Sequence, residues 1–120
     1  MKQILVIEDD RLISSLVTFK LKKEGYNITV ATNGKEGINL FNTVSPDLLI
    51  TDVLVPREDG VEIIDYVKEK KPDCPVIVLS TEGDKEDFVK EALNSGASDH
   101  MAKPFHPNEL ASRVRNLMRN

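Results

Sequence analysis

The stretch ILVIEDD at residues 4–10 joins a continuous apolar run to three consecutive acidic residues. Apolar side chains on both faces are expected of a strand that is buried on both sides within a parallel sheet. Two further runs of this kind occur, LLI at 48–50 and VIVL at 76–79, and weaker runs occur at 28–31 and 100–102. The sequence therefore predicts five buried strands.

Segments with helical spacing of apolar residues separate these runs and follow the last one. They fall at 12–21, 38–41, 61–67, 89–93 and 110–117. Gly25 and Gly96 follow the first and fourth of these segments, where a left-handed residue commonly ends a helix, and Pro107 fits the first turn of the fifth. A strand–helix order repeated in this way predicts a parallel sheet with helices on both faces. We expect a flavodoxin-like, doubly wound α/β fold with strand order 2-1-3-4-5 and a ligand crevice beyond the carboxyl ends of the strands.

Length and composition limit the classes of protein to consider. The 120 residues predict one domain over 1–120, with a formal net charge of −4. Cys74 is the only cysteine, which excludes an internal disulfide and favours a reducing, cytoplasmic setting. No apolar run is long enough for a signal peptide or a membrane span, and the acidic balance disfavours direct binding of nucleic acid. We expect the partners to be proteins or small ions.

Polar side chains follow the predicted strands at the points where they end. Glu8, Asp9 and Asp10 follow the first strand, Asp52 ends the third, Ser80 and Thr81 end the fourth, and Lys103 follows the fifth. Because the carboxyl ends of parallel strands lie at one edge of a sheet, these groups should converge on one crevice. Asp10 has a second interpretation, as part of an acidic group that complements the dipole of the following helix.

Converging carboxylates repel one another unless a cation lies among them. Oxygen ligands from one or two carboxylates, completed by water, are typical of Mg²⁺. A metal beside Asp52 would leave one carboxylate oxygen free as a nucleophile, while Lys103 and Ser80 would contact the oxygens of an incoming phosphoryl group. The predicted chemistry is phosphoryl transfer onto Asp52.

The chain resembles the receiver domain of bacterial two-component response regulators, the CheY-like family, over essentially its whole length. Four stretches carry the resemblance: ILVIEDD at 4–10, LLITDVLVPREDG at 48–60, VIVLST at 76–81 and GASDHMAKPF at 96–105. The resemblance implies a phosphorylation-activated signalling switch rather than an enzyme. A sensor histidine kinase would donate the phosphoryl group, with Mg²⁺ as the cofactor or Mn²⁺ in its place.

The resemblance also implies roles for individual residues. Asp52 would be the phosphoacceptor, and the metal would be held by Glu8, Asp9, Asp52 and the backbone carbonyl of Leu54. The groups in contact with the phosphoryl group or coupled to it would be Ser80 as the switch hydroxyl, Thr81, Lys103 and His100. The Lys103–Pro104 peptide bond would be cis, a geometry that X–Pro bonds adopt at modest cost.

Two positions depart from the family pattern. His100 stands where the family usually has tyrosine or phenylalanine, and its ring carries two polar nitrogens. Thr81 stands where the family generally has alanine or glycine, and together with Leu54 it is expected to hinder the water that hydrolyses the acyl phosphate.

The last third of the chain resembles receivers of the winged-helix class of transcriptional regulators. This resemblance implies a phosphorylation-dependent homodimer in which Lys85 pairs with Glu109 and Asp99 pairs with Arg113, between subunits. The alternative is an ordinary charged surface, because exposed ion pairs contribute at most about 1 kcal/mol each. With no room for an output module in 120 residues, transcription regulation would act through a domain outside this chain.

Three other functions make different demands on the sequence. A stand-alone, chemotaxis-type receiver would act by binding another protein. A small aspartate-nucleophile phosphatase would carry its nucleophile after the first strand in an Asp-x-Asp arrangement, which Glu8-Asp9-Asp10 does not match. A flavin protein would need backbone N–H groups and hydroxyls around the flavin phosphate, whereas the first strand ends in acids.

Overall fold

The protein alternates strands and helices, as the sequence predicts. A computed structural model describes residues 2–55, 58–81 and 86–119. The elements are β1 (Gln3–Ile7), α1 (Arg11–Lys23), β2 (Asn27–Ala31), α2 (Gly34–Val44), β3 (Leu48–Asp52), β4 (Leu54–Val55), β5 (Glu58–Asp59), α3 (Gly60–Lys70), β6 (Val76–Ser80), α4 (Glu86–Asn94), β7 (Asp99–Ala102) and α5 (Pro107–Met118).

The five predicted strands form one parallel sheet in the order β2-β1-β3-β6-β7. Since β6 and β7 are the fourth and fifth strands that the sequence predicts, this order confirms 2-1-3-4-5 and the doubly wound fold. The structure adds a short antiparallel hairpin, β4 with β5, between the third strand and α3. This hairpin could not be predicted from the sequence, because strands of two residues are too short to show an apolar alternation.

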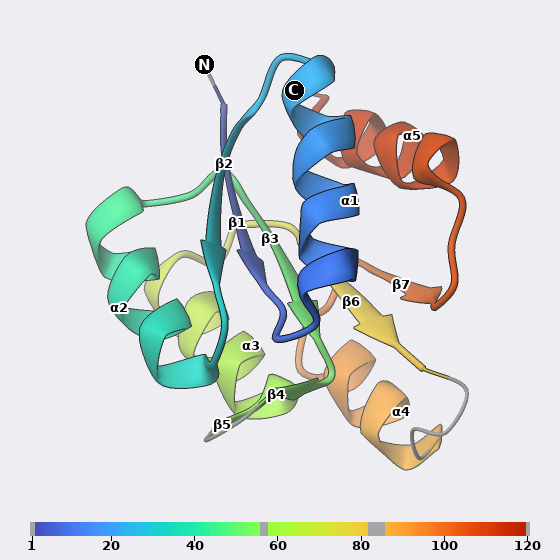
Figure 1. The fold of residues 1–120 in the computed structure, drawn as a ribbon. Coiled ribbons are helices and arrows are strands. Elements are labelled where there is room, and N and C mark those ends of the chain that lie inside the picture. The colour runs from blue at the N-terminus through green and yellow to red at the C-terminus, as the bar shows by residue number, and fades with distance from the viewer. Residues whose placement is uncertain (1, 56–57, 82–85, 120) are drawn as a thin grey trace.

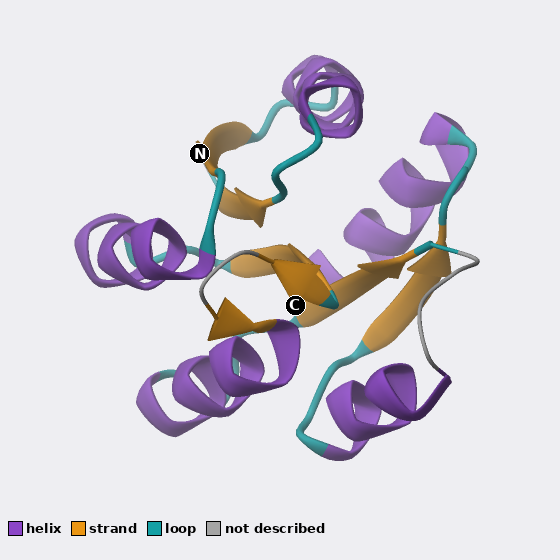
Figure 2. Cartoon of the chain, turned by 60° about the horizontal axis from the view of Figure 1, so that its bottom comes forward, coloured by secondary structure: helices purple, strands orange, loops and turns teal. Residues whose placement is uncertain are grey.

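Helices cover both faces of the sheet, so its central strands are buried on both sides (Figures 1 and 2). On one face α1 and α5 pack through Val17, Leu21, Leu110 and Val114 onto alternate strand residues such as Ile4 and Ile50. On the other face α2, α3 and α4 supply Phe41, Ile64 and Ala92, which pack onto the intervening strand residues such as Leu5 and Val78. This alternation determines toward which layer each side chain at the end of a strand points.

Two glycines end helices as predicted. Gly25, after α1, has a φ of 99°, and Gly96, after α4, has a φ of 117°. A side chain is strained at such angles, and glycine adopts them readily. Among the residues that the structure describes, no helix is both long enough and apolar enough to cross a membrane.

Candidate functional site

The carboxyl edge of the sheet brings Glu8, Asp52 and Lys103 together from three separate parts of the chain. Glu8 follows β1, Asp52 ends β3, and Lys103 follows β7. The Lys103 ammonium lies 2.5 Å from Glu8 Oε1 and 2.7 Å from Asp52 Oδ2. Glu8 is 1% exposed and Asp52 is 6% exposed, so this is a buried ionic cluster. The sequence predicted that these residues converge, and the structure places them in contact.

Strand alternation explains why the Glu8 and Asp52 side chains, which share Lys103, point the same way. Ile4 and Val6 in β1, and Leu48 and Ile50 in β3, face α1 and α5. Glu8 and Asp52 continue these two series at intervals of two residues, and the Glu8 N–H continues the sheet by donating to the Ala31 carbonyl at 2.9 Å. The ionic cluster therefore lies on the α1 and α5 side of the sheet.

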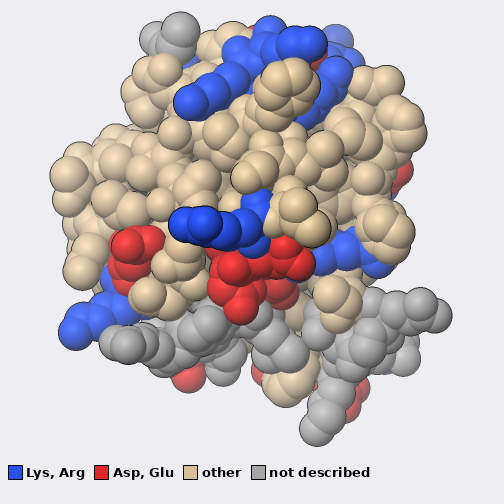
Figure 3. Space-filling view, in the orientation of Figure 1, with Lys and Arg blue, Asp and Glu red and all other residues tan. Residues whose placement is uncertain are grey.

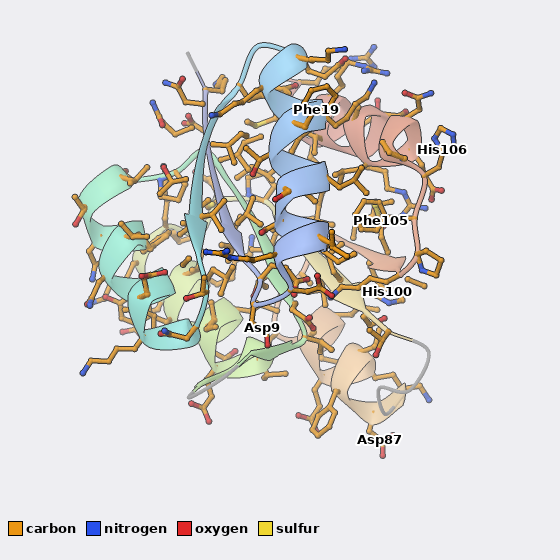
Figure 4. All side chains as sticks on the ribbon, in the orientation of Figure 1. Asp9, Phe19, Asp87, His100, Phe105 and His106 are labelled. Carbon is orange, nitrogen blue, oxygen red and sulfur yellow. The ribbon has the colours of Figure 1, made fainter. Side chains whose placement is uncertain are left out.

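Three carboxylates at this edge form a set that suits a divalent cation. Glu8, Asp9 and Asp52 each offer an oxygen, and these oxygens lie within 4.8 Å of one another. Asp9, which Figure 4 labels, is exposed, so this set of carboxylates opens toward solvent. Hard oxygen donors of this number fit Mg²⁺ completed by water, and Mn²⁺ accepts the same ligands. Leu54 begins β4 two residues after Asp52, and its carbonyl as a further ligand stays a prediction.

Burial and pairing act in opposite directions on the charges of the cluster. Burial raises the pKa of Glu8 above its ordinary value, although hydrogen bonds from Lys103 and from the Asp10 N–H lower it in part. Burial disfavours the charge on Lys103, but the hydrogen bonds to Asp52 and Glu8 outweigh burial and raise the pKa of the ammonium. Lys103 thus stays cationic and is held by both carboxylates, which leaves the cluster with an excess of negative charge when all its acids are ionised.

Asp10 lies next to the ionic cluster but has a structural role. Its side chain caps α1, and its Oδ1 accepts hydrogen bonds from the N–H groups of Leu12 at 2.9 Å and Ile13 at 3.3 Å. An N-cap residue satisfies N–H groups that have no partner within the helix. The structure therefore supports the helix-end interpretation of Asp10 and leaves Asp9 as the acid at the open side of the cluster.

Ser80 and His100 form a side-chain hydrogen bond that the sequence analysis did not foresee. The distance between Ser80 Oγ and His100 Nε2 is 2.6 Å. Ser80 is 4% exposed, and His100 is half-buried on β7, where Figure 4 labels it. No local sequence signal pairs these residues: His100 lies opposite Val78 in the register of β6 and β7, and this register brings its ring near Ser80, two residues further along β6.

Thr81, Pro104 and His106 complete this end of the molecule. Thr81 is exposed directly after β6, and its effect on hydrolysis stays a prediction. The Lys103–Pro104 peptide bond is cis, and the Lys103 N–H donates to the Ser80 carbonyl at 2.7 Å. This bond ties the backbone of Ser80 to the segment that carries Lys103. His106, which follows that segment, caps α5 by accepting a hydrogen bond from the Asn108 N–H at its Nδ1.

The residues that the sequence analysis assigned to a dimer surface are paired inside one chain. Arg113 donates to Asp99 Oδ1 at 2.7 Å, to the His100 carbonyl at 3.0 Å and to Glu109 Oε1 at 2.8 Å. Asp99 and Arg113 were expected to pair between subunits, which stays a prediction; within one chain they already form an ion pair, because α5 packs beside β7 and brings them into reach. Lys85, the predicted partner of Glu109, lies outside the described residues.

Charged side chains also gather visibly on the surface. Figure 3 shows acidic side chains grouped in the middle of one face with basic side chains directly against them, and a second basic group at the end of the molecule away from α4.

Comparison with known proteins identifies the class of protein that this fold and site define. The family model described as the response regulator receiver domain matches residues 4–115. The chain therefore belongs to the response regulator receiver domain family, whose members are signalling proteins that act as phosphorylation-dependent switches.

The curated relatives that the chain resembles are transcriptional regulators. It is 35% identical over 118 residues to the alkaline phosphatase synthesis transcriptional regulatory protein PhoP of Bacillus subtilis, covering 98% of this chain and 49% of PhoP. It is 35% identical over 120 residues to the phosphate regulon transcriptional regulatory protein PhoB of Escherichia coli, covering 98% of this chain and 52% of PhoB. The chain thus spans about half the length of the curated relatives it matches.

Solved structures agree with this assignment. A response regulator receiver domain protein from Clostridium thermocellum superposes with a TM-score of 0.89 at 31% identity, covering 98% of this chain and 94% of that one. The receiver domain of NtrX from Brucella abortus superposes with a TM-score of 0.89 at 28% identity, covering 96% and 97%. The fold is therefore that of a receiver domain.

Proposed function

We propose that Asp52 accepts a phosphoryl group from a phosphohistidine of a sensor histidine kinase, and that the aspartyl phosphate switches the surface formed by α4, β7 and α5. The observation that carries this proposal is the position of Asp52. It is a buried carboxylate that shares the Lys103 ammonium with Glu8 and lies beside an exposed acid, Asp9. Structural ion pairs do not require an open carboxylate set, whereas phosphoryl transfer does.

The residues of the cluster have distinct tasks in this transfer. An Asp52 oxygen attacks phosphorus, the new O–P bond forms as the N–P bond to the donor imidazole breaks, and the imidazole leaves with the electron pair and takes up a proton. Lys103 neutralises the oxygens of the arriving group, and the Ser80 hydroxyl donates a hydrogen bond to one of them. Glu8, Asp9 and Asp52 would hold Mg²⁺, which would supply the further positive charge that such a transfer needs.

The output is expected to act through protein contacts. The named relatives are transcriptional regulators of about twice this length, which supports transcription regulation through a domain outside residues 1–120. In this proposal the chain is a single receiver domain, a phosphoacceptor rather than an enzyme. A stand-alone receiver of the chemotaxis type, which binds a target protein directly, remains the alternative.

Phosphorylation-dependent dimerisation is proposed as one form of this output. Arg113 would exchange its partner Asp99 within the chain for Asp99 of a second copy, and Glu109 would be released to pair with Lys85 of that copy, an exchange that costs little because these side chains are half-exposed. Sedimentation of the phosphorylated chain should show a dimer that the Arg113→Glu variant lacks. A phosphorylated chain that remains monomeric at high concentration contradicts this part of the proposal.

The phosphoacceptor assignment is tested by incubating the protein with Mg²⁺ and acetyl phosphate and measuring its intact mass. We expect one added phosphoryl group in the wild type and in Asp73→Ala, a control that changes an exposed acid before β6. Asp52→Ala and wild-type protein in excess chelator should show no added mass. A phosphoryl group retained in Asp52→Ala contradicts the assignment. Rapid turnover of acetyl phosphate by the wild type, without accumulation of phosphoprotein, favours the phosphatase alternative.

A further inference from the structure

The hydrogen bond between Ser80 and His100 joins a hydroxyl of the proposed phosphoryl site to a side chain outside that site. At 2.6 Å between Oγ and Nε2 it is short for a hydrogen bond between a hydroxyl and a nitrogen. Ser80 is 4% exposed, so its hydroxyl has little access to water as an alternative partner. The ring of His100 is therefore a substantial partner of this hydroxyl in the structure.

The two side chains point away from the ionic cluster. In the register of β6 and β7, Val78 is opposite His100, and Ser80 follows Val78 on the same face. Val78 belongs to the core under α2, α3 and α4. Asp52 is opposite Leu79, whose side chain lies in the core under α1 and α5. Ser80 Oγ and the Asp52 carboxylate thus start on opposite sides of the same sheet edge.

These directions make the two uses of the Ser80 hydroxyl mutually exclusive. To donate to a phosphoryl oxygen on Asp52, Ser80 must rotate about χ1 over the end of β6, and it then leaves Nε2 of His100. Ser80 is the last residue of its strand, and its backbone stays fixed by the bond from the Lys103 N–H to its carbonyl. A rotation of one side chain between two staggered positions is a small and rapid change.

We propose that His100 is a positioning residue that holds the Ser80 hydroxyl away from Asp52 and so weakens the binding of the phosphoryl group. This inference rests on the proposed function, and it assigns to this chain a direct restraint on the switch hydroxyl. The restraint is reversible, because a hydrogen bond from Ser80 to an anionic phosphoryl oxygen is stronger than the bond between Ser80 and the ring nitrogen. Phosphorylation can therefore overcome the restraint but must first break it.

The surroundings of His100 keep the ring in place on β7. The His100 carbonyl accepts from Arg113 of α5 at 3.0 Å, and its N–H donates to Asp99 Oδ1 at 2.8 Å. In the described part of α4, Phe88, Val89 and Ala92 lie on the packed side and the charged residues are exposed. The N–H and the carbonyl of His100 are thus both bonded independently of its ring. Replacing the ring nitrogen therefore removes the bond to Ser80 and leaves these backbone contacts in place.

The expected effect is modest and measurable. The net contribution of one side-chain hydrogen bond corresponds to roughly a two- to tenfold change in an equilibrium constant. His100→Met, which has similar length and no strong acceptor or donor, should therefore bind a phosphoryl mimic two- to tenfold more tightly than the wild type. His100→Gln, whose side-chain amide can still bond to Ser80, should stay within about twofold of the wild type.

The experiment titrates the protein with beryllium fluoride and Mg²⁺, followed by NMR, in four variants and the wild type. Beryllium fluoride binds a carboxylate as a mimic of the phosphoryl group. Besides His100→Met and His100→Gln, the set includes Ser80→Ala and the double variant Ser80→Ala with His100→Met. We expect the tighter binding of His100→Met to disappear in the Ser80→Ala background, because the two residues then have no bond to lose.

A second measurement uses the wild type alone, so the test does not depend on the folding of His100→Met. The ring ¹⁵N signal of His100 should change when beryllium fluoride and Mg²⁺ bind, because Nε2 loses the Ser80 hydroxyl, and this change should be much smaller in Ser80→Ala. A ring signal that responds equally in both proteins overturns the inference, as does unchanged affinity in His100→Met. If the wild type fails to bind beryllium fluoride at all, the proposed function fails instead.

Discussion

The two ends of the sheet both hold buried or half-buried charges, but they satisfy them in different ways. At the carboxyl end, the Lys103 ammonium is paired with the carboxylates of Glu8 and Asp52. At the amino end, lysines bond to the backbone: Lys71 Nζ donates to the Pro46 carbonyl at 2.6 Å, and Lys68 Nζ donates to the Cys74 carbonyl at 2.7 Å. The amino end even has a cavity of about 440 Å³, with Lys71 and Cys74 in its lining.

This difference shows where the fold can carry out chemistry. Side chains that pair with one another can exchange partners when a metal ion or a phosphoryl group arrives. A lysine bonded to loop carbonyls cannot exchange partners without leaving the backbone unsatisfied, which is costly. The cavity at the amino end thus lies among loops that lysine–carbonyl hydrogen bonds hold closed. The ionic cluster at the carboxyl end can instead exchange its partners.

The largest effect is expected from Lys103→Met, which leaves two buried carboxylates without their counter-charge. The loss should be about 3–5 kcal/mol in the free energy of unfolding at neutral pH without Mg²⁺, as for other broken buried pairs. Burial already raises the pKa of Glu8, and loss of the ammonium raises it further. The penalty is present above that pKa and shrinks as pH falls and the carboxyl takes up a proton. Urea unfolding at several pH values measures it.

Addition of Mg²⁺ separates this effect from a general loss of packing. A divalent cation between the carboxylates should restore part of the stability of Lys103→Met and raise its midpoint of unfolding more than that of the wild type. An equal response to Mg²⁺ in both proteins would mean that the carboxylates are not the source of the lost stability.

Lys71→Met is the matched change at the amino end and should cost about 1–2 kcal/mol, because a half-buried charged donor leaves carbonyls without their partner. No carboxylate pair is disturbed there, so the response to Mg²⁺ should equal that of the wild type. The same urea titration, with and without Mg²⁺, measures both quantities. A Mg²⁺ response that differs from that of the wild type would remove the contrast between the two ends.

Asp10→Ala tests the division of labour among the adjacent acids at the carboxyl end. Loss of the α1 cap should lower the free energy of unfolding by about 1 kcal/mol and leave Mg²⁺ binding largely intact. Asp9→Asn, its neighbour at the open side of the carboxylate set, should show the reverse pattern. Thermal unfolding and Mg²⁺ titration of both variants give the comparison, and identical behaviour of the two would contradict separate roles.

The smallest effect concerns Cys74, at the amino end. Burial raises the pKa of the Cys74 thiol, against the lowering effect of Lys71 and Lys68. The thiolate is the reactive form, so alkylation by iodoacetamide at pH 8.5 should be much slower in the folded protein than in urea. Intact mass after timed labelling measures both rates. Equal rates would show that the amino end opens readily, which would contradict its description as an end closed by its loops.

Much of this architecture could be predicted from local sequence patterns. The apolar runs at 4–7, 48–50 and 76–79 mark strands that are buried on both faces, and Gly25 and Gly96 mark helix ends, because these signals depend on neighbours in the chain. The hairpin of β4 and β5 escaped prediction because its strands are too short for a periodic signal. The family resemblance added the assignment of Asp52, and the match of the family model over 4–115 confirms the class of protein.

Contacts between distant residues depend on register and packing. The sequence placed Lys103 near Asp52. The sharing of its ammonium between Glu8 and Asp52 follows from the way in which three strand ends meet in the structure. The sequence also paired Asp99 with Arg113, but between subunits, whereas the packing of α5 against β7 forms this pair within the chain.

By itself, the sequence determined the order of strands and helices, the receiver class and the acids, hydroxyl and lysine at the carboxyl edge, because periodicity and motif spacing are local properties of the chain. The tertiary structure alone decided the directions: Glu8, Asp52 and Lys103 toward α1 and α5, and Ser80 with His100 toward the opposite layer. The physical reason is the two-residue alternation of a strand, whose register with its neighbours fixes which side chains face one another.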